Sequence, residues 1–256
     1  MQRAAVSRLA AFSFVIAGTF GTAYGLGQKL PGNPESRPHT HNTAASLIPP
    51  AFSVGGYTLV TDANQPSTSS LALHVDGPDG QRITQYVEAH GSMLHVVLIR
   101  PDLSGFQHVH PDIAADGSFV VPIGQPGKWH IVIDAQPAGA PTSIALATNV
   151  DDEVPVAKVA LPAPDDVVTV DGLTITRQGL TFVLSSTDGL APYLGQPAHL
   201  IAIRQGDLAY THLHPAEAMT GMFAFDGSLT PGTYRLFLQF GYRNQVRTVA
   251  FTVVQK

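Results

Sequence analysis

Two stretches of this chain repeat one pattern: HVVLIRPDLSGFQHVHP from His95 to Pro111 and HLIAIRQGDLAYTHLHP from His199 to Pro215. Each begins with a histidine and a short apolar run that ends in arginine. After a turn segment, each ends in aromatic-x-His-x-His-Pro. Every histidine of the second stretch lies 104 positions after its counterpart in the first. A pattern kept at this spacing indicates that one structural unit is built twice.

The sequence around both stretches is typical of β-structure. Short runs of β-branched and aromatic residues, among them YTLV, LALHV, KWHIVIDA, LTFVL and TYRLFLQF, alternate with Gly, Pro and Asp turns. Strands of this length at this spacing predict antiparallel β-sandwiches. We therefore expect an all-β fold: two tandem immunoglobulin-like or cupredoxin-like sandwiches, preceded by an N-terminal hydrophobic helix.

The repeat also predicts the domain boundaries. The first β-sandwich module is expected over residues 51–150 and the second over 166–256, each near the size of a seven-stranded sandwich. Between them, residues 151–165 are acidic and contain proline, which is typical of an inter-domain linker. Residues 29–50 are polar and proline-rich and predict an extended tether.

Residues 1–28 predict export from the cytoplasm. Arg3 and Arg8 precede an uncharged apolar run, the arrangement of a secretory signal peptide. The segment fits a signal peptide cleaved after Ala23 or Gly25, and it also fits a single membrane anchor, because about 20 residues can just span a bilayer. Under both interpretations the rest of the chain is extracytoplasmic, either secreted or held at the membrane by its N-terminal helix.

Composition excludes several classes of site. The chain contains no cysteine, so disulfides, cysteine nucleophiles, thiolate zinc sites and blue-copper ligand sets are ruled out. The formal net charge is −5 and no Lys/Arg cluster occurs, so we expect no nucleic-acid partner. The motifs of hydrolases, zinc proteases and phosphate-binding loops are also absent, so we expect no enzyme.

The first repeated stretch predicts a β-hairpin, because PDLSG is a turn signal between two strand-like runs. His108 and His110 are two residues apart and therefore project from the same face of a strand. If Asp102 and Leu103 form the tip, His95 lies opposite His110, and all three imidazoles share that face. A slip of one residue would place His95 on the other face.

Three imidazoles on one face suit a first-row metal ion, with zinc and copper as the candidates. Met93 lies two residues before His95, and Met219 and Met222 follow the second His-x-His-Pro. A thioether beside histidines favours copper over zinc. The predicted metal ligands are His95, His108, His110, His199, His212 and His214, with Met93 as an additional candidate.

A structural interpretation of the same histidines stays open. A histidine in a strand is commonly a core or surface residue whose ring nitrogens bond to neighbouring polar groups. Duplication copies such a structural hairpin as readily as a set of ligands. On this view the chain is a tandem sandwich that serves a structural or interaction role at the cell surface.

Three further segments carry a family resemblance: GFQHVHP…DGSF, PYLGQPAHLIAIRQGDLAYTHLHP and PGTYRLFLQF…VRTVAFTV. They resemble a family of exported bacterial proteins, common in actinobacteria and loosely described as heavy-metal-associated, whose genes often neighbour copper-transport genes. The resemblance covers almost all of 51–256 and implies extracytoplasmic metal handling by the six repeated histidines. One departure is EAHGSML before His95, where the family usually has a more charged segment.

Together these patterns predict an exported, non-catalytic metal-binding protein. Each module is expected to hold one ion, copper in preference to zinc, on its three-histidine face. The expected role is buffering of the metal or its delivery to a membrane metal transporter.

Overall fold

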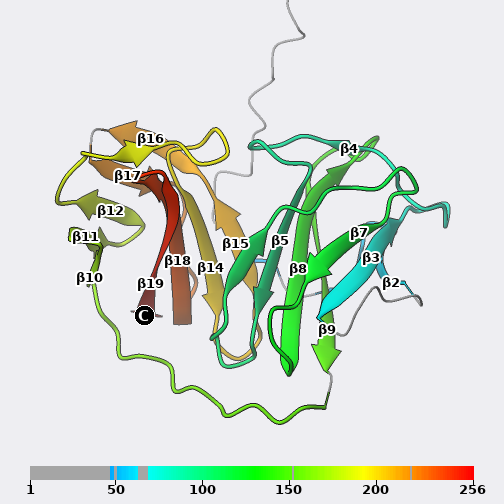
Figure 1. Ribbon diagram of the computed structural model, residues 1–256, viewed down its shortest axis with the longest axis horizontal. Helices are drawn as coiled ribbons and strands as arrows, with labels where there is room; N and C mark the ends of the chain where they lie inside the picture. Colours follow the sequence, from blue (N-terminus) through cyan, green and yellow to red (C-terminus); the bar gives the residue numbers. More distant parts are fainter. Residues whose placement is uncertain (1–46, 49–50, 63–68, 152, 220) are drawn as a thin grey trace, which may run out of the picture. The chain divides into compact units, whose positions relative to one another are not determined.

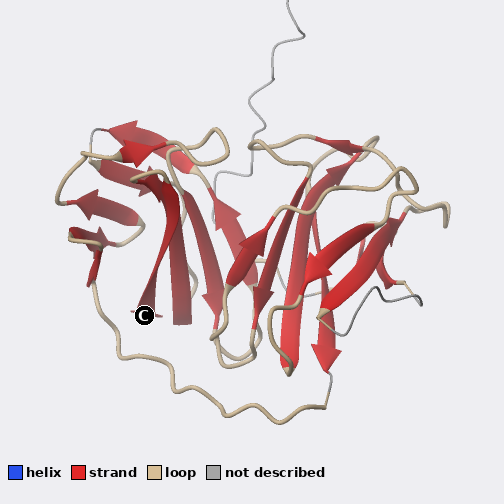
Figure 2. Ribbon diagram, viewed as in Figure 1, coloured by secondary structure: helices blue, strands red, loops and turns tan. Residues whose placement is uncertain are grey.

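The computed structural model describes residues 47–48, 51–62, 69–151, 153–219 and 221–256, with only the backbone of residues 216–219. The export segment expected at 1–28, with its hydrophobic helix, lies outside the described residues, as does nearly all of the tether. Every regular element in the described part of the chain is a β-strand (Figure 2). In the same residues there is no helix with the length and apolar character needed to cross a membrane.

The first module consists of two antiparallel sheets (Figure 1). One has the strand order β1-β2-β3-β7. The other has the order β4-β8-β5-β6, and β9 also pairs with β8. The strands are β1 (Ser53–Val54), β2 (Tyr57–Thr61), β3 (Ser70–Asp76), β4 (Tyr86–Val87), β5 (Leu94–Ile99), β6 (Gln107–Val109), β7 (Phe119–Pro122), β8 (Lys128–Pro137) and β9 (Ile144–Asp151).

The second module repeats this plan. Its sheets have the orders β10-β11-β12-β17-β16 and β13-β18-β14-β15, with β19 paired to β18. The strands are β10 (Val167–Val170), β11 (Leu173–Gln178), β12 (Thr181–Leu184), β13 (Leu190–Ala191), β14 (His199–Arg204), β15 (Tyr210–Leu213), β16 (Pro215–Met219), β17 (Met222–Phe225), β18 (Gly232–Tyr242) and β19 (Gln245–Gln255).

Each module has its own hydrophobic core between its two sheets. In the first, Leu73 and Phe119 of one sheet pack with Leu98 and Ile131 of the other. In the second, Phe182 meets Phe251 across the same kind of gap, with ring centroids 5.4 Å apart. The prediction of two tandem antiparallel β-sandwiches is therefore confirmed.

A third hydrophobic cluster joins the two modules. Alternate residues of β5 and β14 point away from their own cores, and Val97 and Ile99 meet Ile201 and Ile203 in this cluster. In the same cluster Phe106 stacks on Phe237 with ring centroids 3.9 Å apart. The central strands are thus apolar on both faces because both faces are covered, as in any sheet packed on two sides. The repeated histidines lie on the same side of each sheet as Val97 and Ile201, which is the side that meets the other module.

Candidate metal centre

The hairpin of β5 and β6 brings the three histidines of the first module together. Val97 pairs with His108 and Val96 with Val109, which continues to His95 opposite His110. This is the register predicted from a tip at Asp102 and Leu103. Nε2 of His110 lies 3.1 Å from Nδ1 of His95. A ligand atom of each of His95, His108 and His110 lies within 4.8 Å of those of the other two. We call these residues triad 1.

The second module builds the same arrangement from β14 and β15. Ile201 pairs with His212 and Leu200 with Leu213, so His199 comes opposite His214. Nδ1 of His199 lies 3.1 Å from Nε2 of His212 and 3.0 Å from Nε2 of His214. The three ligand atoms again lie within 4.8 Å of one another. We call His199, His212 and His214 triad 2.

A backbone carbonyl orients the first histidine of each triad. Nε2 of His95 lies 3.0 Å from the carbonyl oxygen of Ala89, and Nε2 of His199 lies 3.0 Å from that of Tyr193. A carbonyl only accepts hydrogen bonds, so each Nε2 carries the proton and donates it. In the neutral ring Nδ1 is then left with its lone pair, directed at the other histidines of the same triad.

The other module orients His108. Its Nδ1 lies 2.7 Å from Oε1 of Gln239, whose amide nitrogen donates to Oγ1 of Thr248 at 2.9 Å. With the amide oriented in this way, Oε1 accepts the proton of His108 Nδ1, and the lone pair is left on Nε2. Among the described residues this buried Nε2 has no hydrogen-bond partner. A buried acceptor without a partner is costly, and a metal ion at triad 1 would satisfy it.

His212, the counterpart of His108, faces an acidic group of the first module. Its Nδ1 lies 3.9 Å from Oδ2 of Asp134, within ion-pair range and beyond a direct hydrogen bond. Burial raises the pKa of Asp134 to about 6. Gln239 and Asp134 occupy equivalent positions, because Gln239 pairs with His199 and Asp134 pairs with His95.

The two triads lie against each other. Ring centroids of His95 and His212 are 5.0 Å apart, and those of His108 and His212 are 5.1 Å apart. These separations between triads match those within them, for example 5.4 Å from His199 to His212. The pairs His95–His212 and His108–His212 join residues of different modules. The six rings therefore form one cluster at the interface between the modules.

The environment keeps four of the imidazoles, those of His108, His110, His199 and His212, neutral near pH 7. His95 is 4% exposed and His199 is fully buried, and the side chain of His212 is 2% exposed. Burial, followed by the repulsion of neighbouring histidines, lowers the pKa of His108 and His212 well below the usual range. Burial also lowers the pKa of His110 and of His199 to about 4. Neutral imidazole is the form that binds metal ions.

The nitrogen positions fit a metal ion closely. Three ligands at a metal–nitrogen distance of about 2.0–2.1 Å in tetrahedral geometry lie roughly 3.3 Å apart. The close pairs in the two triads are 3.0–3.1 Å apart. Three imidazoles also leave the fourth tetrahedral position for water or another ligand. The two buried triads are therefore able to hold a metal ion each.

Other candidate residues from the sequence lie elsewhere. Met93 precedes β5 with 47% of its surface exposed, and its role as a ligand stays a prediction. Nδ1 of His74 lies 2.8 Å from Oδ1 of Asp62, and Nδ1 of His130 forms a hydrogen bond with Oδ1 of Asn149 at 2.8 Å. Of the methionines after the second motif, Met222 begins β17.

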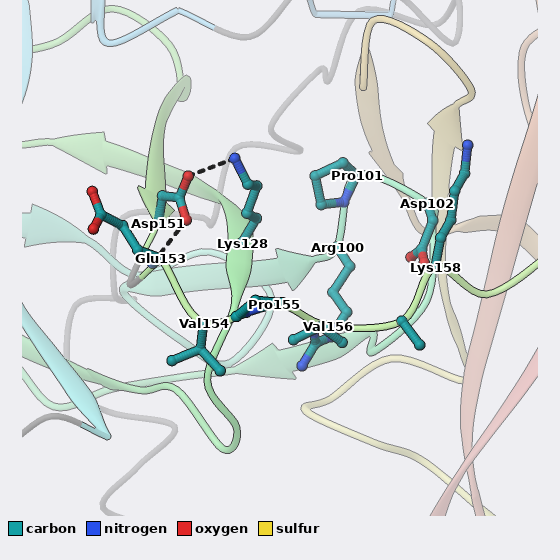
Figure 3. A pocket seen from close by; sticks show the side chains of 11 residues that line it. Arg100, Pro101, Asp102, Lys128, Asp151, Glu153, Val154, Pro155, Val156 and Lys158 are labelled. Atoms are coloured by element: carbon teal, nitrogen blue, oxygen red, sulfur yellow. Dashed lines mark hydrogen bonds and ion pairs between the residues drawn. The ribbon is translucent and has the colours of Figure 1, made fainter.

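A hollow of about 600 Å³ lies away from the triads, where the linker after β9 follows the first module (Figure 3). It is lined by both signs of charge, and Lys128 pairs with Asp151 at 2.6 Å. Asp102 accepts a hydrogen bond from the backbone N–H of Val159 at 2.7 Å, so the linker is held against the hairpin tip. These contacts give the hollow a structural explanation.

Sequence reasoning missed three residues of the cluster. Gln239 and Asp134 lie far from the repeated stretches along the chain, and His90 stacks on His214 with ring centroids 3.6 Å apart. His90 occupies a turn in the segment EAHGSML, and it holds a φ of 54° there. One signal could have pointed to an interface: HVVLIR and HLIAIR are apolar at every position between the histidine and the arginine.

Residues 53–152 and 168–256 match a family described as a domain of unknown function (DUF8832). The match spans more than half of the chain and covers both modules, so the chain belongs to this family. No curated protein matches the chain. Among solved structures, the FN1–FN3 domains of chicken CNTN1 match 83% of this chain and 69% of that chain at 9% identity, with a TM-score of 0.20. A TM-score this low carries no argument.

Proposed function

We propose that this member of the DUF8832 family is an exported, non-catalytic metal-binding protein that holds one copper ion in each triad. The supporting observation is that hydrogen bonds to the backbone orient the first histidine of each triad towards the other two. His95 and His199 each direct a lone pair into the triad, because their other nitrogen donates to a backbone carbonyl. Oriented imidazoles of this kind are typical of metal sites.

Copper is favoured over zinc on the chemistry of the donors. Neutral imidazole binds both ions, and Cu²⁺ stands above Zn²⁺ in the general order of affinities for divalent ions. The chain offers no thiolate that would change this order. The methionine beside the first triad, Met93, adds a donor that prefers Cu(I) if it turns inward.

Buffering or delivery fits such sites better than catalysis. Nothing beyond the triads suggests reaction chemistry: the sequence has no nucleophile motif, and the hollow beside the linker lies away from the histidines. The arginines and apolar run at the N-terminus support export, which would place the sites where metal arrives from outside the cytoplasm. A membrane metal transporter is then the proposed recipient.

A structural role is the second candidate, and one observation favours it. The nitrogens that lie 3.0–3.1 Å apart are also at hydrogen-bond distance, so the histidines can bond to one another without an ion. In that case the hydrogen bonds between the rings of each triad serve to hold its hairpin in place against the neighbouring module.

Metal titration of the full chain separates the two candidates. The background carries His39→Ala and His41→Ala, so that the tether histidines add nothing to the count. Cu²⁺ is added in competition with a chromophoric chelator, and Zn²⁺ is added in parallel. We expect two ions per chain, one ion after His110→Ala or His214→Ala, and a higher melting temperature with bound metal.

The matched control is His74→Gln, which removes a histidine that lies beside Asp62 and outside both triads. This variant should still bind two ions. Binding of no ion by the parent chain, or of two ions by both single variants, His110→Ala and His214→Ala, would overturn the proposed function and leave the structural candidate.

A further inference from the structure

We propose that the two triads form a single dinuclear metal centre, in which the second module orients a ligand of triad 1 and a carboxylate of the first module faces a ligand of triad 2. This inference rests on the proposed function, and it goes beyond two independent sites. Gln239 of the second module positions His108 of triad 1. Asp134 of the first module stands at the equivalent place beside His212 of triad 2.

The first step of the argument is the crossed geometry. Gln239 is the register partner of His199, yet its Oε1 bonds to His108 of the other module at 2.7 Å. Asp134 is the register partner of His95, and its carboxylate lies 3.9 Å from His212 of the other module. Each residue therefore lies beside its own triad and faces the opposite one.

The second step is what these contacts do to the ligands. A group that accepts the proton of one ring nitrogen determines which nitrogen keeps its lone pair and holds the ring in orientation. For His108 that contact leaves the buried Nε2 facing its own triad, where it has no hydrogen-bond partner in the part of the chain that the structure describes. The second module thus completes triad 1.

The third step is proximity. Ring centroids of the two triads approach to 5.0 Å and 5.1 Å, and His90 of the first module stacks on His214 of triad 2. The rings that surround one ion are therefore in contact with those that surround the other. Ions held in the two triads would therefore be close enough to influence each other through these shared ring contacts.

The residues that face His108 and His212 differ in charge, and this difference predicts the order in which the two triads bind copper. Behind His212 stands a carboxylate, and behind His108 stands a neutral amide. A carboxylate behind an imidazole raises the basicity of that ligand more than an amide does. We therefore expect triad 2 to fill first when copper is limiting.

Titration with Cu²⁺ alone tests the positioning residue. In a full chain carrying His39→Ala, His41→Ala and His214→Ala, triad 1 is the remaining site, and all its ligands lie in the first module. We expect Gln239→Leu to weaken copper binding there about 10- to 100-fold. Gln239→Glu, which keeps an acceptor for His108 Nδ1, should restore most of the affinity. Arg235→Gln, on the same strand and face, is the matched control and should have no effect.

Electron paramagnetic resonance tests the proximity. The chain with both triads loaded with Cu²⁺ should show a spectrum broadened by coupling between the two ions. The His110→Ala and His214→Ala variants, each with one ion, should show the sharper spectrum of an isolated ion.

The outcomes separate this inference from the function on which it rests. If the parent chain binds no copper, both are overturned. The dinuclear centre alone is overturned if two ions bind, their spectrum is the sum of the single-ion spectra, and Gln239→Leu leaves the affinity of triad 1 unchanged. Circular dichroism checks that each variant is folded. Weak binding by Gln239→Leu counts only if that variant is folded and Gln239→Glu binds more tightly.

Discussion

Triad 1 and triad 2 share their inner geometry and differ in what surrounds it. Both have the same register, the same carbonyl behind the first histidine and nearly the same nitrogen separations. Behind the second histidine, however, one triad has the amide of Gln239 and the other the carboxylate of Asp134. The comparison teaches that duplication kept the arrangement that a metal ion would use, while the interface made the two copies unequal.

The largest expected effects come from removing the first histidine of either triad. His199→Ala and His95→Ala should each lower the count of bound copper ions from two to one. Each should also reduce the free energy of unfolding by about 2–4 kcal/mol, because a buried carbonyl loses its donor and a cavity is left. We expect the greater loss for His199, which is fully buried and close to two ring nitrogens. Urea unfolding in the presence of a chelator, followed by metal titration, measures both.

A destabilised His199→Ala chain that still binds two ions would separate the two roles. In that case the histidine would be needed for packing and not for metal, and the likeness between the triads would be structural only.

Acid should weaken the metal-free protein. The pKa values of His108, His110, His199 and His212 are lowered in the folded state, so the unfolded chain binds more protons below its own value of about 6.5. Stability is therefore full above pH 6.5 and falls as the pH drops towards 4. Asp134, with its pKa raised to about 6, acts in the opposite sense between pH 6 and 4.

Each net proton changes the free energy of unfolding by about 1.4 kcal/mol per pH unit, so a loss of several kcal/mol is expected. Urea unfolding at several pH values in a chelator measures it. Stability that stays constant across this window would show that the rings are accessible to protons in the folded state. Bound copper should delay the loss to lower pH, because protons then compete with the ion.

The smallest effect is expected from the turns that precede the two triads. His90 in the first turn stacks on His214, whereas the equivalent residue in the second turn is Leu194, which also holds a positive φ. We expect His90→Ala to weaken copper binding at triad 2 about threefold, in line with the ~0.5–1 kcal/mol of a ring contact. Leu194→Ala is the matched control. Equal effects of the two changes on triad 2, measured in the His110→Ala background, would contradict a specific role for His90.

Much of the site was predictable from local rules. Side chains two apart in a strand share a face, and a hairpin with its tip at Asp102 and Leu103 places His95 opposite His110. The same rules applied to the second copy place His199 opposite His214. The six histidines at which the two copies match accordingly come together in two groups of three.

The outer residues of the cluster could not be predicted in the same way. Gln239 and Asp134 reach their histidines only because β18 and β8 pack face to face with the other module. Nothing in the spacing of these residues along the chain indicates that contact. His90 likewise has no histidine counterpart in the second copy, and the interface is what gives it His214 as a stacking partner.

The sequence by itself determined that this protein is a doubled β-sandwich and that each half gathers three imidazoles on one face. Strand periodicity and turn chemistry act over a few residues, and their result can be read directly from the pattern. Only the tertiary structure decided that the two histidine faces meet, that Gln239 and Asp134 each face a ring of the other module, and that the copies differ. Those features depend on how two apolar sheet faces pack, and such packing is a long-range choice that no local pattern contains.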